Sequence, residues 1–131
     1  HYLDRGHAFW VAGQEEGAII GTVALECFPA LPGAPGAALI REETVRLAGC
    51  DCALERLYVH PQARRQGAGR MLVQTVLDEA RRRGCRHLEI WSDQRFLAAH
   101  RLYASFGAVT IAERICHDPD HSPEWGLLLS L

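Results

Sequence analysis

The stretch that decides the fold is Leu54–Gly84, LERLYVHPQARRQGAGRMLVQTVLDEARRRG, where the hydrophobic pattern changes from that of a strand to that of a helix. Its first residues form a β-prone apolar run that stops at His60-Pro61. From Gly67 onward the apolar residues recur every three or four positions, as they do on one face of a helix. The sequence therefore predicts a strand, a short basic turn and an amphipathic helix over residues 67–83.

The start of this helix has the properties of an anion-binding site. The first amides of a helix lack internal partners and lie at the positive end of the helix dipole. Glycines at positions 67 and 69 let the backbone approach a ligand closely. Formal positive charge around the turn comes from Arg64, Arg65 and Arg70. A bound phosphate group is therefore expected here.

Two widespread phosphate motifs do not fit the turn. A P-loop needs a lysine and the chain has none, whereas a dinucleotide fingerprint needs a glycine where Leu72 stands. The pattern Arg64-x-x-Gly67-x-Gly69 instead resembles the acyl-CoA signature of the GNAT N-acetyltransferase superfamily, Gln/Arg-x-x-Gly-x-Gly/Ala. Downstream, AHRLYASFGA at 99–108 resembles the family's second landmark, a helix ending in Tyr, three residues and Gly-Phe, with Ala108 in place of Phe. The resemblance covers roughly residues 9–131.

Size and composition indicate one domain over residues 1–131. The chain has 48% hydrophobic residues, a net charge of -2 and a pI near 6.4, so nothing in its overall charge favours nucleic acid or anionic membranes. No apolar run approaches the ~20 residues of a membrane span, and the five cysteines are odd in number without a Cys-x-x-Cys pair. We expect a soluble, cytoplasmic protein with reduced thiols.

The remaining elements complete a mixed sheet. We expect a hairpin over 9–13 and 18–26, a loop over 28–38, either a short helix or an extension of the hairpin over 39–49, strands over 52–60, 87–91, 109–115 and 125–131, and a helix over 96–106. The fold class is α/β, with a central parallel β-α-β crossover and antiparallel hairpins at both ends, as in the GNAT fold. The chain starts with His, and we find no segment for the family's first strand and first two helices, which are expected to be absent or trimmed.

The resemblance implies acetyl-CoA as co-substrate and assigns its contacts. The backbone of one strand would pair with the pantetheine, and the turn would hold the pyrophosphate. The residues so assigned are Leu57, Tyr58, Val59, Arg64, Arg65, Gln66, Gly67, Ala68, Gly69 and Arg70. Ordinary surface charges are the alternative for Arg64 and Arg65, but their position beside the anion site favours a CoA contact for at least one of them. Phe96 stands where the family often has Asn, so one polar cofactor contact is expected to be absent or replaced.

Two residues are candidates for proton transfer. The resemblance gives Tyr103 the role of the acid that protonates the leaving thiolate, whereas its helical spacing also fits core packing. Glu55 is the candidate base, and strand alternation places it with Leu57 and Val59, opposite Tyr58. Apolar neighbours would raise its pKa, although a cross-strand ion pair is an equal alternative.

The acidic loop at 116–124 contains His117, Asp118, Asp120, His121 and Glu124. Prolines at 119 and 123 prevent the helix on which a His-x-x-x-His spacing would bind zinc, so we expect no metal. The loop is interpreted either as part of an acceptor site that attracts a cationic amine or as a solvated hairpin loop.

The function that the resemblance implies is acetyl-CoA-dependent acetylation of a primary amine by direct transfer in a ternary complex. A non-catalytic acyl-CoA binding or regulatory module is the alternative. The expected partner is a small-molecule or peptide amine, and exposed hairpins at both ends of the sheet favour a homodimer.

Overall fold

The computed structural model describes residues 6–13, 17–64, 67–116 and 118–131. In chain order the elements are β1 (His7–Gly13), β2 (Ile19–Cys27), β3 (Ala38–Arg41), β4 (Thr44–Leu47), β5 (Cys52–Val59), the 3-10 turn η1 (Pro61–Ala63), α2 (Ala68–Arg82), β6 (His87–Asp93), α3 (Leu97–Ser105), β7 (Val109–Ile115) and β8 (Pro123–Ser130). The structure contains every strand and helix that the sequence predicts without an alternative.

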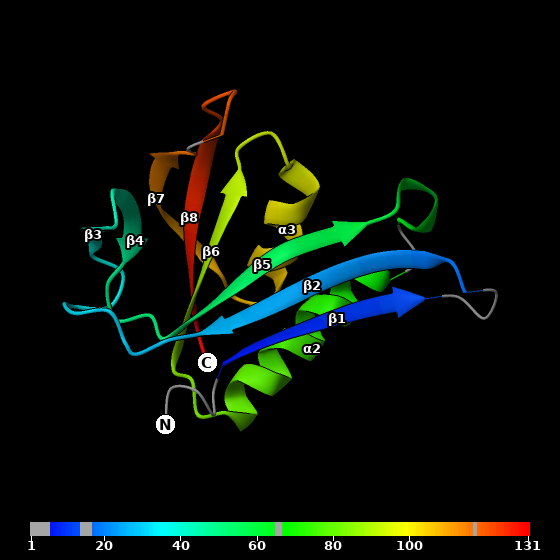
Figure 1. The fold of residues 1–131 in the computed structure, drawn as a ribbon, viewed down its shortest axis with the longest axis horizontal. Coiled ribbons are helices and arrows are strands. Elements are labelled where there is room, and N and C mark those ends of the chain that lie inside the picture. Colours follow the sequence, from blue (N-terminus) through cyan, green and yellow to red (C-terminus); the bar gives the residue numbers. More distant parts are fainter. Residues whose placement is uncertain (1–5, 14–16, 65–66, 117) are drawn as a thin grey trace.

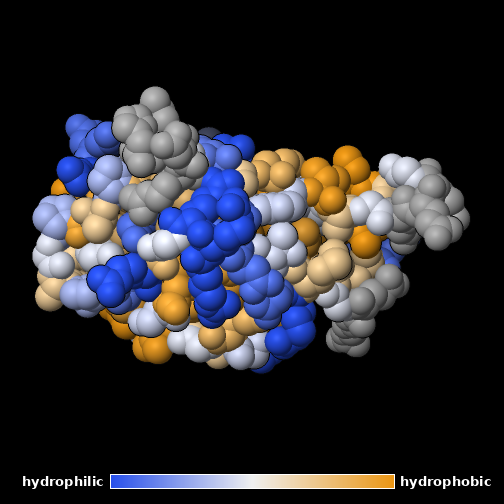
Figure 2. Space-filling view, turned by 90° about the horizontal axis from the view of Figure 1, so that it is seen from below, coloured by the Kyte–Doolittle hydropathy of each residue, from blue (hydrophilic) through white to orange (hydrophobic). Residues whose placement is uncertain are grey.

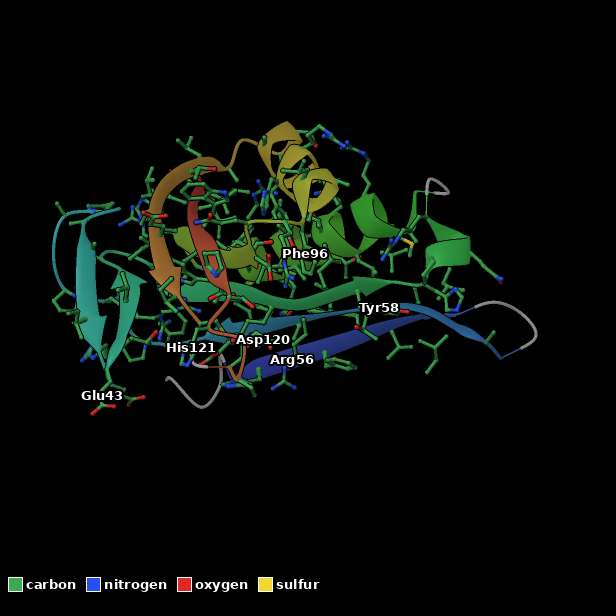
Figure 3. All side chains as sticks on the ribbon, turned by 90° about the horizontal axis from the view of Figure 1, so that it is seen from above. Glu43, Arg56, Tyr58, Phe96, Asp120 and His121 are labelled. Atoms are coloured by element: carbon green, nitrogen blue, oxygen red, sulfur yellow. The ribbon has the colours of Figure 1, made fainter. Side chains whose placement is uncertain are left out.

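Six strands form one twisted sheet in the order β1-β2-β5-β6-β8-β7 (Figure 1). Only the β5–β6 pair among these neighbours is parallel, and α2 forms the crossover between its two strands. The predicted mixed sheet with a central parallel crossover and terminal hairpins is confirmed. In the view of Figure 3, α2 and α3 lie on the same side of β1, β2 and β5.

The core lies between the sheet and α2, which packs on β1, β2 and β5. The helix buries one stripe of residues: Ala68, Leu72, Val73, Val76, Leu77 and Ala80. Its outer face carries Asp78, Arg81 and Arg82, and Figure 2 shows hydrophilic residues gathered across the middle of the face seen from below. Among the residues that the structure describes, no helix has the length and apolar character needed to cross a bilayer.

Residues 39–49 do not form a helix or extend the first hairpin. They lie mainly in a separate two-stranded sheet, β3–β4, whose pairing runs from Ala38↔Leu47 to Arg41↔Thr44. The two-residue turn places Glu42 at φ 51° and Glu43 at φ 65°, the left-handed backbone of tight hairpin turns. Because Asn and Gly are the usual residues there, Glu-Glu carries no hairpin signal in the sequence.

Candidate active site

Strands β5 and β6 separate after three residue pairs. Their parallel ladder joins Cys52 to Leu88, Ala53 to Glu89 and Leu54 to Ile90, and then ends. Beyond it β5 continues with β2, and β6 continues with β8, so the two strands diverge as Figure 1 shows. Within the described residues, the β6-facing edge of residues 55–59 thus has no strand partner. An extended ligand could pair with this edge.

A β-bulge at Arg56 reverses the alternation of β5. Ala24 of β2 pairs with Glu55, whereas Thr22 pairs with Tyr58, so β5 contains one extra residue. Arg56 has φ 56°, and the Thr22 hydroxyl donates a 3.0 Å hydrogen bond to its carbonyl oxygen. The bulge is therefore held from the neighbouring strand.

This bulge corrects the predicted position of Glu55. Leu54 belongs to the core against α2, and Leu57 and Val59 pack on the same core. Glu55 instead lines a pocket with Ala53. Tyr58, which is 49% exposed, does not belong to the core either. The prediction that Glu55 shares a face with Leu57 and Val59 was wrong, because a regular alternation was carried through the extra residue.

The Glu55 carboxyl is poised to accept a proton near neutral pH. Burial, followed by a hydrogen bond and charge repulsion from Glu26, raises the pKa of Glu55 to about 7. The guanidinium groups of Arg56 and Arg46 act in the opposite direction. The expected rise in pKa is present and burial is its largest cause, but Glu26 contributes to it as well, and Leu57 and Val59 do not share the face of Glu55.

The first turn of α2 carries no acidic residue. Gly67 is its N-cap residue with φ 81° and makes no side-chain cap. The Arg64 Nε donates to the carbonyl of Val59 at 3.3 Å, which holds this arginine at the end of β5. Arg65 and Gln66, also predicted to bind the cofactor, lie outside the described residues. The first amides of α2 can therefore receive an anion.

Two other predicted residues of the turn, Gly69 and Arg70, lie against α3 and its C-cap. A Cβ on Gly69 would lie 3.2 Å from Leu102, so this glycine allows α2 to approach α3. Ala68 is buried. The Arg70 guanidinium donates to the Ser105 hydroxyl at 3.0 Å and lies 5.1 Å from the centre of the Phe106 ring. Arg70 is thus oriented by the end of α3.

Tyr103 belongs to α3 and is almost fully buried. Its side chain is 4% exposed and belongs to the core cluster that contains Leu54 and Ile90, the last pair of the ladder. Among the described residues, the Tyr103 hydroxyl has no hydrogen-bond partner. Every fully buried side-chain N or O atom of these residues does have a partner. The hydroxyl oxygen therefore reaches accessible surface. Burial raises the pKa of Tyr103 to about 12, so the phenol keeps its proton.

A pocket of about 300 Å³ lies beside Glu55. Its wall includes Thr44, Arg46, Arg56, Glu89, Trp91 and Arg114. A larger depression of about 510 Å³ is lined by residues 84–87 and 130–131, none of them from β5 or the basic turn. The larger depression has no lining residue from β5 or the basic turn, so the smaller pocket is the better candidate for an acceptor site.

Sequence reasoning missed the ion pairs that build this pocket. Glu89, 1% exposed, pairs with Arg46 and accepts hydrogen bonds from the Leu47 amide at 2.9 Å and from Trp91 Nε1 at 3.2 Å. These bonds join β4 of the separate hairpin to β6. A carboxylate between the apolar residues Leu88 and Ile90 was the available signal, but its partner could not be identified without the position of the hairpin.

Arg114 also lines the pocket. Its Nε donates to Glu124 at 2.9 Å, its Nη1 donates to the Val45 carbonyl at 2.9 Å, and the guanidinium lies 4.2 Å from the centre of the Trp91 ring. Gly126 leaves room for that ring, because a Cβ there would lie 2.6 Å from Trp91. The pocket is thus lined by four strands, β4, β5, β6 and β7.

One group of metal-ligand types occurs among the described residues: Asp51, Cys52 and Cys85. Asp51 already accepts hydrogen bonds from the amides of Arg86 and His87. Burial raises the pKa of Cys52, and raises that of Cys85 to about 11, which favours thiols over the thiolates that zinc binds. In the acidic loop, the Asp118 carboxylate accepts a hydrogen bond from the Ser122 amide at 3.1 Å. His117 of this loop lies outside the described residues.

Comparison with known sequences identifies relatives of this chain. The model of the acetyltransferase (GNAT) family matches residues 1–108. An uncharacterized N-acetyltransferase of Schizosaccharomyces pombe is 31% identical over 109 residues, which make up 83% of this chain and 55% of the yeast protein. The chain therefore spans about half the length of this curated relative.

Solved structures share the fold at low identity. The NatC complex bound to Gag peptide and CoA matches 94% of this chain and 70% of the solved chain, with 18% identity and a TM-score of 0.71. A putative acetyltransferase from Salmonella typhimurium with its cofactor acetyl-CoA matches 98% and 67%, with 21% identity and a TM-score of 0.68. Since the family model covers most of the sequence and these structures share its fold, the chain belongs to the acetyltransferase (GNAT) family.

Proposed function

We propose that the protein is an acetyl-CoA-dependent N-acetyltransferase that transfers an acetyl group directly to a primary amine in a ternary complex. The observation that carries this proposal is the opening between β5 and β6, with an uncapped helix N-terminus near one end and Glu55 beside a pocket at the other. A donor and an acceptor could then meet across β5 without a covalent enzyme intermediate.

The proposed donor site combines two backbone features. The open edge of residues 57–59 would hydrogen-bond the pantetheine as an added strand, and the amides of residues 67–70 would bind the pyrophosphate. Arg64 and Arg70 lie at this turn and would strengthen the attraction to the phosphates. Relatives of the same fold were solved with CoA or acetyl-CoA, which supports this assignment.

The transfer requires one base and one proton donor. The acceptor nitrogen uses its lone pair to form the new C–N bond, while the C–S bond breaks and its electron pair goes to sulfur. Glu55, with a pKa of about 7, would remove the proton that the nitrogen loses, directly or through water. Tyr103 would donate a hydrogen bond or a proton to the departing sulfur. The products are the N-acetyl amine and the CoA thiol.

The high pKa of Tyr103 limits its role. A phenol with a pKa of about 12 is a weaker acid than a thiol, whose pKa is about 8.5. Complete proton transfer to the thiolate is therefore uphill, and the main contribution of Tyr103 would be a hydrogen bond to the charge that develops on sulfur. Solvent can then supply the final proton.

The acceptor is proposed to be a small-molecule or peptide amine that enters the pocket beside Glu55. The acidic loop with Asp118 and Asp120 would attract it by charge. We also retain a homodimer and a cytoplasmic location as proposals; the five free cysteines are in line with a reducing compartment.

The decisive experiment measures release of CoA thiol from acetyl-CoA in the presence of a panel of primary amines, with mass spectrometry of the products. An acetyltransferase produces an N-acetyl amine and CoA in equal amounts. CoA binding without any amine-dependent thiol release would instead favour a non-catalytic acyl-CoA module.

A further inference from the structure

Two consecutive side chains of β5, Glu55 and Arg56, line the same pocket. In a regular strand neighbouring side chains point to opposite faces of the sheet. Here the left-handed backbone of Arg56, φ 56°, breaks that rule, and the bond from the Thr22 hydroxyl holds the carbonyl in place. Residues with a Cβ adopt this backbone rarely, and such outliers gather at functional sites.

The guanidinium of Arg56 differs from those of the other two arginines in the pocket. Arg46 is paired with Glu89, and Arg114 is paired with Glu124. Within the described parts of the chain, no hydrogen bond or ion pair engages the side chain of Arg56, which is exposed. In Figure 3 it lies on the side of the sheet away from α2 and α3. Its charge therefore remains available to a ligand in the pocket.

The side chains of Glu55 and Arg56 do not form an ion pair with each other. Among the described residues no hydrogen bond joins these two side chains either, and Arg56 acts on the pKa of Glu55 through its charge. The pocket thus presents a carboxyl group and an unpaired guanidinium side by side. A ligand that carries an amine and an anionic group within a few bonds would match both.

We propose that the acceptor is a small amino acid-like molecule, whose carboxylate binds Arg56 while its amine faces Glu55. The inference rests on the proposed acetyltransferase function and adds the class of its substrate. Guanidinium groups bind carboxylates through two parallel hydrogen bonds, which would also orient the amine. A volume of about 300 Å³ is at the lower end for ligand pockets and suits a molecule of this size.

The test compares matched acceptors on the full chain. The panel consists of the common free amino acids, the amide of each, and the corresponding decarboxylated amine, with acetyl-CoA as donor. We expect kcat/KM for at least one amino acid to exceed that of its amide by tenfold or more. Arg56→Gln should lower kcat/KM for that amino acid by about 10- to 100-fold, mainly through KM, because the contact exists before and during transfer.

Controls separate charge recognition from folding. Arg56→Gly accepts the left-handed backbone and should lose the same preference, whereas Arg56→Lys should recover part of it. Arg41→Gln removes an exposed arginine of β3 outside the pocket and should change nothing. At pH 9, where Glu55 is ionised with or without the charge of Arg56, the decarboxylated amine should be acetylated equally by wild type and Arg56→Gln, within about threefold.

Three results would overturn the inference. One is equal or better turnover of the amides and decarboxylated amines by the wild type. Another is a preference for the amino acid that survives in both Arg56→Gln and Arg56→Gly. The third is CoA binding with no turnover of any carboxylated acceptor. A protein that does not bind CoA at all would refute the proposed function as well, and calorimetry with CoA distinguishes this case from the others.

Discussion

Replacement of Glu55 by glutamine should abolish the dependence of catalysis on a group with a pKa of about 7. If Glu55 is the base, wild-type kcat/KM reaches full value above pH 7 and falls about tenfold for each unit below it. Glu55→Gln removes the base and should lower kcat/KM by about 10²- to 10³-fold at pH 8. At pH 5, where the wild-type carboxyl is mostly protonated, the difference should shrink to about tenfold or less.

A substitution of Glu26 should also change the pKa of Glu55, because Glu26 contributes to its rise. Burial is the largest cause of the rise from 4.5 to about 7, and the hydrogen bond and charge of Glu26 come next. Glu26→Gln removes the charge but not the burial. The inflection of the pH profile should therefore move below 7 and remain above 4.5.

The assay is the initial rate of thiol release with one acceptor, from pH 5 to pH 9, for wild type and both variants. The acceptor amine also titrates, but dividing the wild-type rate by the Glu55→Gln rate at each pH cancels its contribution. A ratio that does not change with pH would refute the assignment of Glu55 as the base. An inflection that Glu26→Gln leaves unmoved would refute the coupling of the two carboxyls.

Stability should change in the opposite direction to activity. The folded-state pKa of Glu55 lies above the unfolded value, so ionisation lowers stability as pH rises from 4.5 to about 7. The shift corresponds to about 3 kcal/mol at most, and solvent screening of this half-buried group reduces it to about 1 kcal/mol. Glu55→Gln should therefore resist urea better than wild type at pH 8, with little difference at pH 4. Lower stability of the variant at pH 8 would contradict the raised pKa.

Three further predictions concern the donor site. CoA at 100 times its Kd should stabilise the protein by about 2.7 kcal/mol and raise Tm by several degrees; no shift at saturating CoA would contradict the proposed donor site. Gly67→Val should weaken CoA binding and cost about 1–2 kcal/mol in urea, because position 67 has φ 81°, whereas Gly67→Asn should recover most of the stability. Tyr103→Phe should lower kcat by about 10²-fold without changing the Kd for CoA, and equal losses in both would make Tyr103 a cofactor contact instead.

The sequence predicted the features of the fold that local pattern determines. The spacing of apolar residues located α2, and the order strand, helix, strand indicated the parallel β5–β6 crossover with its free helix N-terminus. These features follow from periodicity and from the few ways in which a right-handed crossover can be built. The resemblance of the turn at Gly67 and of Tyr103 to a known family then supplied the proposed chemistry.

The acceptor side could not be predicted from local pattern. The bulge at Arg56 has no glycine to reveal it, so the face of Glu55 was assigned wrongly. The β3–β4 hairpin turns at Glu42-Glu43 without Asn or Gly, and the pairing of Arg46 with Glu89 joins residues 43 positions apart. Such contacts depend on the tertiary arrangement, and they produce no periodic pattern of residues that could be recognised in the sequence.

A crystal structure of the protein with CoA would test the proposed donor site most directly. We predict that the pantetheine lies along residues 57–59 of β5, with the pyrophosphate about 3 Å from amides of the first turn of α2 and the sulfur close to the Tyr103 hydroxyl. CoA bound elsewhere, for example in the depression at residues 84–87, or a pantetheine that bypasses the opening between β5 and β6, would contradict the proposed donor site.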